Sequence, residues 1–273
     1  MNSLQDKSLH RIALCMHGLS HSAWDNKSHG PVQYELGYKL IKQEILDRYP
    51  DQIDVFVHTW NDGNRDRIME DYKPKKWIIG DKTKVTAHIR ARSKSNLVSY
   101  DIVNKLRKEY EKENNINYDC IIMTRFDLII QLDCDLTKLD MTRFWTPATY
   151  KPNQANWDLQ FLKDNIYCYE WILVSNGENF DEFCRLAEVW DDNAKKTGNY
   201  IRKEGKGRNT NNPHHMLAYY FVHNSKLADK FDMIPIKDMK TCSGNCVGRI
   251  NGKRDLNALK KQFPVFKDLK IPN

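Results

Sequence analysis

Long hydrophobic runs are absent from this chain of 273 residues. No apolar stretch approaches the roughly 18 residues that a membrane-spanning helix needs. The first ten residues, 1–10, are polar and lack the hydrophobic segment of a secretory signal peptide. Internal repeats and low-complexity tracts are missing as well. We therefore expect a globular cytoplasmic protein without a transmembrane segment.

Cysteine pairing is not suggested by the sequence. The seven cysteines are scattered and odd in number, and several lie inside apolar, strand-like runs. A disulfide scaffold is thereby disfavoured, and reduced thiols are the simplest interpretation. Cys242 and Cys246 have CxxxC spacing, but no second pair of ligands lies nearby, so a zinc site is not expected there.

Positive charge is what the chain has in excess. Lys and Arg number 43 against 36 Asp and Glu, a net charge of +7, and 40% of the residues are hydrophobic, enough for a real core. The excess suits an anionic partner such as a nucleotide, a nucleic acid or an acidic membrane face. The cations are spread rather than striped, and no helix-turn-helix or zinc finger is present. A basic nucleic-acid-binding module therefore remains an alternative and not the main hypothesis.

Strands and helices alternate through the first half of the sequence. Four apolar runs predict strands, and two segments with helical spacing lie between them. In the second of these helices we expect Val98, Ile102, Leu106 and Tyr110 to face the core. This order predicts an α/β fold, a largely parallel sheet with helices on its faces. The predicted strands are 11–16, 53–60, 76–79 and 120–124, and the predicted helices are about 31–49 and 95–112.

The second half is less regular. Short strands are expected at 144–145 and 166–174, and a helix is expected to open after Asn176 and Gly177. The polar stretch 195–212 predicts a mobile loop, and Pro213 begins another helix. No linker divides the chain, so a single domain is expected, with a basic tail from 236 to 273.

Polar and aromatic residues follow the predicted strands at their carboxyl ends, where open α/β sheets bind ligands. His17 and Gly18 follow the first strand, Trp60 ends the second, and Asp127 follows the fourth. Each has a plain alternative: a core position for Trp60, a simple turn for Gly18, and a helix cap or ion-pair partner for Asp127. Their clustering at one edge favours a ligand site.

Basic residues strengthen that expectation. Arg125 either pairs with a carboxylate or contacts phosphate as a planar fork. Arg90, Arg92 and Ser93 precede the 95–112 helix, and basic side chains at a helix N-terminus favour anions. The alternative for these three residues is an ordinary solvated turn.

Four segments at the expected spacing resemble one enzyme family. They are IDVFVHTW at 53–60, YKPKKWII at 72–79, RSKS at 92–95 and YDCIIMTRFDL at 118–128. Together they resemble GT-A-fold glycosyltransferases of large DNA viruses, notably chlorella viruses, and of bacterial surface-polysaccharide clusters. The resemblance covers residues 8–225 as a pattern and is clearest over 53–60 and 72–130.

The resemblance implies a GT-A-like fold and a nucleotide-sugar donor, expected to be UDP-linked, with a glycan as acceptor. About 8–130 would form the nucleotide-sugar-binding half and about 131–235 the acceptor half. Xylose, rhamnose or a related pentose or deoxyhexose is the first sugar to test. The donor contacts that it implies are His17, Gly18, Leu19, His58, Thr59 and Trp60.

The same resemblance implies Mn²⁺ or Mg²⁺ at an Asp-x-Asp motif, but this place reads Arg125-Phe126-Asp127. One carboxylate is left, and a cation stands in the other position. Two alternatives follow. Arg125 partly replaces the metal by neutralising diphosphate charge, or Asp127 holds the metal, with His214 as a further candidate ligand. The literal motif at 133–135 is interpreted as a surface turn.

Inverting transfer needs a base that deprotonates the acceptor hydroxyl. Asp164 and Asp158 are the candidates, with Glu170 behind them, and the alternative for each is a surface carboxylate. A retaining enzyme would need no such base. A phosphosulfate-dependent sulfotransferase is the other enzyme hypothesis, although the turn at 17–22 lacks the Lys or Arg expected to cradle phosphate.

Overall fold

The first half of the chain is a regular alternation of strands and helices. The computed structural model describes residues 11–20, 34–80, 94–126, 128, 131–132, 134–147, 171–203, 213–223, 225–234 and 236–238. The elements of the first half are β1 (Ile12–Gly18), α1 (Tyr34–Ile41), a π-helical turn η1 (Lys42–Leu46), β2 (Ile53–Thr59), α2 (Arg65–Tyr72), β3 (Lys76–Ile79), α4 (Lys94–Asn114) and β4 (Cys120–Arg125).

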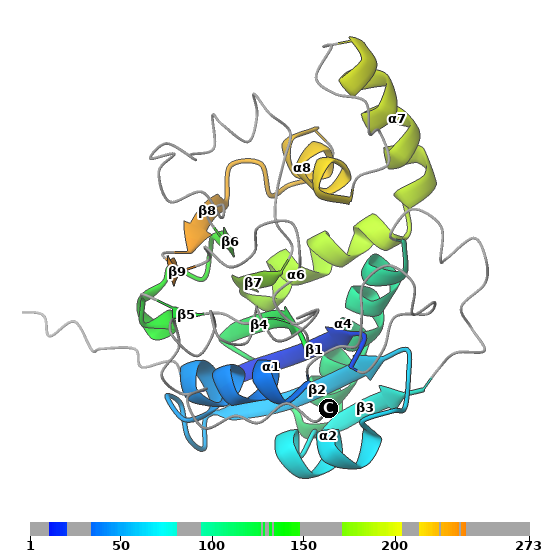
Figure 1. The fold of residues 1–273 in the computed structure, drawn as a ribbon. Coiled ribbons are helices and arrows are strands. Elements are labelled where there is room, and N and C mark those ends of the chain that lie inside the picture. Colours follow the sequence, from blue (N-terminus) through cyan, green and yellow to red (C-terminus); the bar gives the residue numbers. More distant parts are fainter. Residues whose placement is uncertain are drawn as a thin grey trace, which may run out of the picture.

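The second half adds shorter strands and further helices (Figure 1). The helices α7 and α8 lie at the opposite end of the molecule from β3 and α2 (Figure 1). The elements are β5 (Gln131–Leu132), η4 (Leu136–Lys138), β6 (Phe144–Pro147), β7 (Ile172–Ser175), α6 (Gly177–Cys184), η5 (Arg185–Ala187), α7 (Trp190–Lys203), α8 (Pro213–His223), β8 (Phe231–Ile234) and β9 (Ile236–Asp238).

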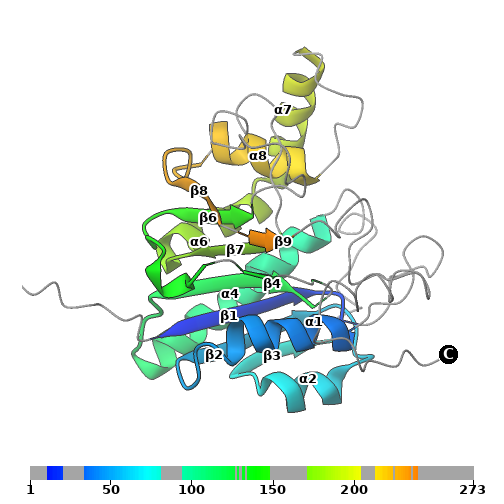
Figure 2. The same ribbon diagram turned by 60° about the vertical axis from the view of Figure 1, so that its left-hand side comes forward.

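One seven-stranded sheet organises the fold, in the order β3-β2-β1-β4-β7-β6-β8. Figure 2 shows these strands stacked from β8 at the top to β3 at the bottom. The four strands β1 to β4 are parallel, β7 runs antiparallel to both β4 and β6, and β8 is parallel to β6. The predicted α/β fold with a mostly parallel sheet and flanking helices is therefore confirmed.

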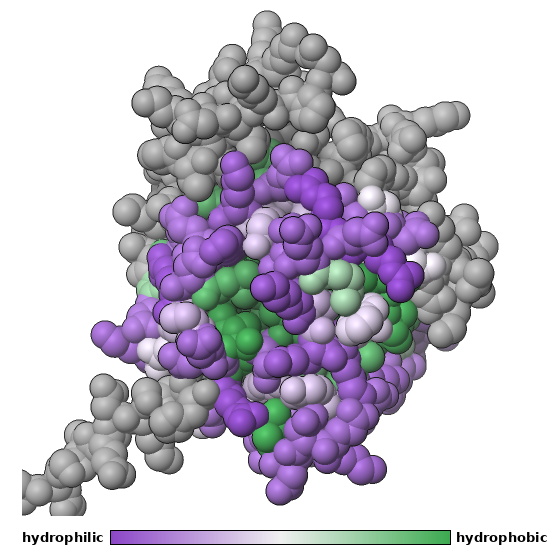
Figure 3. All heavy atoms as spheres, turned by 90° about the horizontal axis from the view of Figure 1, so that it is seen from below, coloured by the Kyte–Doolittle hydropathy of each residue, from purple (hydrophilic) through white to green (hydrophobic). Residues whose placement is uncertain are grey.

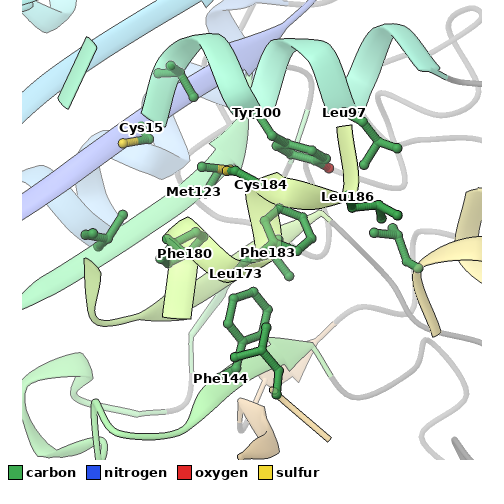
Figure 4. Packing of buried hydrophobic residues seen from close by; sticks show 14 of the residues in the cluster. Cys15, Leu97, Tyr100, Met123, Phe144, Leu173, Phe180, Phe183, Cys184 and Leu186 are labelled. Atoms are coloured by element: carbon green, nitrogen blue, oxygen red, sulfur yellow. The ribbon is translucent and has the colours of Figure 1, made fainter. Parts of the chain in front are cut away.

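Side chains of alternate β1 residues build two separate cores. Ile12, Leu14 and Met16 belong to a cluster with α1 and α2, whereas Ala13 and Cys15 belong to a cluster with α4 and α6. Successive residues of a strand point to opposite faces, so β1 is apolar on both sides, as expected of a central parallel strand. Figure 4 shows the second core, where Tyr100 of α4 and Phe183 of α6 lie with ring centroids 5.2 Å apart.

The buried face of α4 differs from the predicted stripe. Of the four expected core residues only Leu106 is buried, and the helix instead buries a face that includes Leu97, Tyr100 and Val103. Residues four apart drift around a helix, because four residues exceed one 3.6-residue turn. The buried face also carries Arg107, which pairs with Glu111 and with Asp181 of α6 and is invisible to a search for apolar residues.

One further prediction about an element was wrong, and one helix was not predicted. Residues 195–203 were expected in a loop, yet they complete the amphipathic helix α7, whose polar composition hid it. The short helix α2 between β2 and β3 was not predicted at all, because it buries only Ile68 and Tyr72. No helix within the described residues is long and apolar enough to cross a membrane. The underside of the molecule, seen in Figure 3, is mainly hydrophilic with hydrophobic areas between.

Candidate functional site

The sheet has a topological switch point between β1 and β4. The chain passes from β1 to β2 and β3 on one side of β1, then returns to place β4 on the other side. The crossover helices α1 and α4 lie on opposite faces, since they belong to different core clusters. In open α/β sheets, ligands bind outside the carboxyl ends of strands at such a point. The residues that end β1 and β4 are therefore where a ligand is expected.

A row of three side chains crosses the strands at this edge. His17 of β1 is in register with His58 of β2 and with Arg125 of β4. Register partners on parallel strands share a face, here the face covered by α4. Both histidines are fully buried, whereas Arg125 is partly exposed. The row thus ends at the switch point in Arg125, a cation that solvent can reach.

His17 is held in its neutral form. Its burial, followed by the neighbouring Arg125 and then His58, lowers the pKa of His17 well below the usual value of 6.5. Its ring lies 4.1 Å from that of Tyr100, and neither ring nitrogen has a hydrogen-bond partner among the described residues. Buried polar atoms are rarely left unsatisfied, and a bound ligand or an ordered water would supply the missing partner.

Ser99 ties the first turns of α4 to the strand ends. Its hydroxyl oxygen accepts a hydrogen bond from the backbone N–H of Gly18 at 3.1 Å. The same hydroxyl is hydrogen-bonded to Nδ1 of His58. One buried hydroxyl therefore fixes the ends of β1 and β2 relative to the helix.

A second network joins the turns that follow β1 and β2. The Ser20 hydroxyl donates to the side-chain carbonyl of Asn61 at 3.0 Å, and the Thr59 hydroxyl donates to the backbone carbonyl of Asn61 at 3.2 Å. The amide of Asn64 donates to the backbone carbonyl of Ser20. These bonds tie Ser20, the last described residue after β1, to the turn that follows β2.

Gly18 gives the turn after β1 its conformation. Its φ is +97°, a value that residues with a side chain rarely adopt. A Cβ added there would meet no atom of the described residues within 4 Å. Gly18 directly follows His17, the residue of β1 that is in register with Arg125.

The residues predicted to contact the nucleotide-sugar donor, where the structure describes them, differ in solvent exposure. Leu19 and Arg125 are partly exposed, whereas the others are buried. Trp60 is 2% exposed and lies edge-on to His58, with ring centroids 4.5 Å apart. It is therefore a core side chain in this structure and offers no exposed ring on which a nucleotide base could stack. The buried predicted residues, which shape the site from beneath, are His17, Gly18, His58, Thr59 and Trp60.

Several predicted site residues lie outside the described residues. Among the described residues no group of three or more His, Cys, Asp or Glu side chains could hold a metal ion. His214 belongs to α8, but its side chain is outside the description. The structure therefore gives no position for the two metal ligands expected from the sequence. At the end of β4, the charged side chain that it does describe is Arg125. The residues outside are Asp127, Arg90, Arg92, Ser93, Asp158, Asp164 and Glu170.

Sequence reasoning missed Ser99, Tyr100 and Gly37. Ser99 and Tyr100 lie on the buried face of α4, so a correct helical phase would have pointed to both. Gly37 lies inside α1, where glycine is costly, and an isolated glycine in a helix usually has a packing reason.

Comparison with known proteins leaves the family open. No family model and no curated protein matches the chain. Among solved structures, the glycosyltransferase GlyE of Streptococcus pneumoniae TIGR4 is similar, in its apo form with a TM-score of 0.36 and 10% identity over 95% of this chain. A second GlyE structure gives 0.36 and 9% identity over 96% of the chain. The chain spans about half the length of GlyE, 51% and 52% of the two structures.

Proposed function

We propose that the protein is a glycosyltransferase that moves a sugar from a UDP-linked donor to a hydroxyl of a glycan. The observation that carries this proposal is the convergence of the glycine turn of β1 with Arg125 of β4 at the switch point. A glycine turn at the switch point and a partly exposed arginine beside it suit a diphosphate. The sequence resemblance adds the donor class, and the sugar, with xylose and rhamnose first, belongs to the same proposal.

The departing diphosphate needs stabilisation more than the intact donor does. Charge develops on the leaving group in the transition state, where a fixed cation is most effective. Arg125 ends the central strand β4 beside His17, whose ring lies 4.1 Å from that of Tyr100 of α4. The strand thereby fixes the backbone from which the Arg125 side chain extends. Arg90, Arg92 and Ser93 remain proposed as further phosphate contacts.

A divalent cation is part of the proposal. Asp127 would hold Mn²⁺ or Mg²⁺, with His214 as a possible second ligand, and the ion would neutralise part of the diphosphate charge. Arg125, two residues before Asp127, would perform the same task. On the acceptor side, Asp164 is proposed as the base and Asp158 as the alternative.

A thermal-shift panel tests the proposal on the intact protein. UDP at about 100 times its Kd should stabilise the fold by about 2.7 kcal/mol. For a chain of this size that corresponds to an increase in Tm of about 5–10 °C. Mn²⁺ should increase the shift, and UDP-xylose or UDP-rhamnose should be hydrolysed slowly without an acceptor.

The same panel contains the outcomes that contradict the proposal. A shift with 3′-phosphoadenosine 5′-phosphosulfate and none with UDP would indicate a sulfotransferase. Salt-sensitive retention on DNA without any nucleotide response would indicate a nucleic-acid-binding module.

A further inference from the structure

Gly37 of α1 lies directly against the backbone at the end of β4. A Cβ built on Gly37 would lie 2.2 Å from the carbonyl oxygen of Phe126 and 3.2 Å from its carbonyl carbon. It would also lie 3.5 Å from the carbonyl oxygen of Leu128. The first distance is far inside van der Waals contact, and the obstacle is main chain rather than a flexible side chain. Only glycine fits here without displacing the segment.

The side chain of Phe126 is held from the same side. Its ring is fully buried and belongs to the core cluster of α1 and α2. The ring centroid lies 6.3 Å from that of Tyr34, in a stacked arrangement, and 5.9 Å from that of Tyr72, edge-on. Backbone and side chain of this residue are thus both fixed by helices on one face of the sheet.

The two helices are joined to each other around this contact. The hydroxyl of Tyr34 donates to a carboxylate oxygen of Asp71 at 3.1 Å, and that of Tyr38 donates to the Asp71 carbonyl at 3.2 Å. Arg67 of α2 pairs with Glu35 of α1 at 2.9 Å. The helices therefore support Phe126 as one unit.

We infer that Gly37 is a positioning residue, which sets the place of the backbone between Arg125 and Asp127. This inference rests on the proposed function, in which those two residues hold the leaving diphosphate. The absence of a side chain at Gly37 lets the segment sit against α1, and the buried Phe126 ring keeps it there. The site is thereby supported from a helix that contributes no group to the chemistry.

Gly37→Ala tests the inference with two readouts. A crystal structure should show the Phe126 carbonyl moved by about 1 Å, the distance that an ordinary contact requires. With UDP-sugar and Mn²⁺, kcat should fall about 100-fold, because misplacement by about 1 Å costs a factor of this size. The KM for the donor should change less than about threefold, since Arg125 and Asp127 act mainly on charge that develops in the transition state.

Lys39→Ala is the matched control, because Lys39 is exposed on the same helix. It should keep wild-type structure and kinetics. Alanine favours helix more than glycine does, so Gly37→Ala should fold unless the contact itself prevents it. If Gly37→Ala does not fold, Phe126→Leu is tested in its place. A native circular dichroism spectrum together with a kcat about tenfold lower supports the inference. A wild-type kcat in Phe126→Leu overturns it.

The readouts separate the two claims. A Phe126 carbonyl at its wild-type place in Gly37→Ala overturns the positioning role, whatever the enzyme does. A displaced carbonyl with wild-type kcat shows that this segment does not serve turnover. Wild-type protein without any UDP-sugar turnover overturns the proposed function instead, and the crystal structures still decide the role of Gly37.

Discussion

Arg125→Met is expected to lower kcat/KM for the UDP-sugar donor about 1000-fold without unfolding the protein. Arg125 ends the central strand β4, is partly exposed and lies in register with the neutral His17. Loss of one preorganised group that stabilises developing charge costs about 100- to 1000-fold. Methionine keeps an aliphatic stem of similar reach, so packing is disturbed little. Steady-state release of UDP measures the effect.

Arg11→Met is the control for this variant. Arg11 is exposed and directly precedes β1, so it lies at the opposite edge of the same sheet. Its removal subtracts the same charge, and kcat/KM should stay within about twofold because solvent-exposed charges more than a Debye length apart are largely screened. If Arg125→Met kept kcat/KM near that of Arg11→Met, the diphosphate would not be held at the end of β4.

Asp164→Asn is expected to lower kcat about 1000-fold and to leave the Kd for UDP unchanged. A positioned base contributes about 100- to 10,000-fold in proton transfer, and asparagine keeps the shape while losing the basic oxygen. In the proposed function the donor is bound by the other half of the chain, so its affinity should persist. Turnover with a glycan acceptor gives kcat, and the thermal shift with UDP gives the affinity.

Asp192→Asn is the matched control for the base. Asp192 lies in α7 with a side chain 64% exposed and paired to Lys196, so its loss should leave turnover unchanged. Asp158→Asn should also retain most activity. Collapse of kcat in Asp158→Asn with activity kept in Asp164→Asn would move the role of base to Asp158. Equal loss of turnover and UDP binding in Asp164→Asn would indicate a structural role.

The strands of the first half could be predicted because each is a short apolar run that ends in a turn. β3 was predicted at its observed bounds, 76–79, and β2 and β4 differ from prediction by one residue at an end. Helices were harder, because their burial depends on tertiary partners. The buried Arg107 donates a hydrogen bond to the carboxylate of Asp181 of α6. The spacing of apolar residues within α4 does not predict such a pair.

The sequence predicted where in the fold the candidate site lies, but it did not predict which side chains are buried there. The carboxyl ends of β1, β2 and β4 were expected to meet, and their parallel register brings them together. Burial could not be read from the residue types: Trp60 and His58 suit a ligand or a core equally well, and packing places both in the core. Gly37 was missed because its effect depends on the backbone of a distant strand.

The most direct measurement is a crystal structure of the full chain soaked with UDP and Mn²⁺. The account predicts the diphosphate beside Gly18, with its oxygens within hydrogen-bond distance of the Arg125 guanidinium. A diphosphate bound elsewhere, with Arg125 turned away from it and the space beside Gly18 empty, would contradict the account.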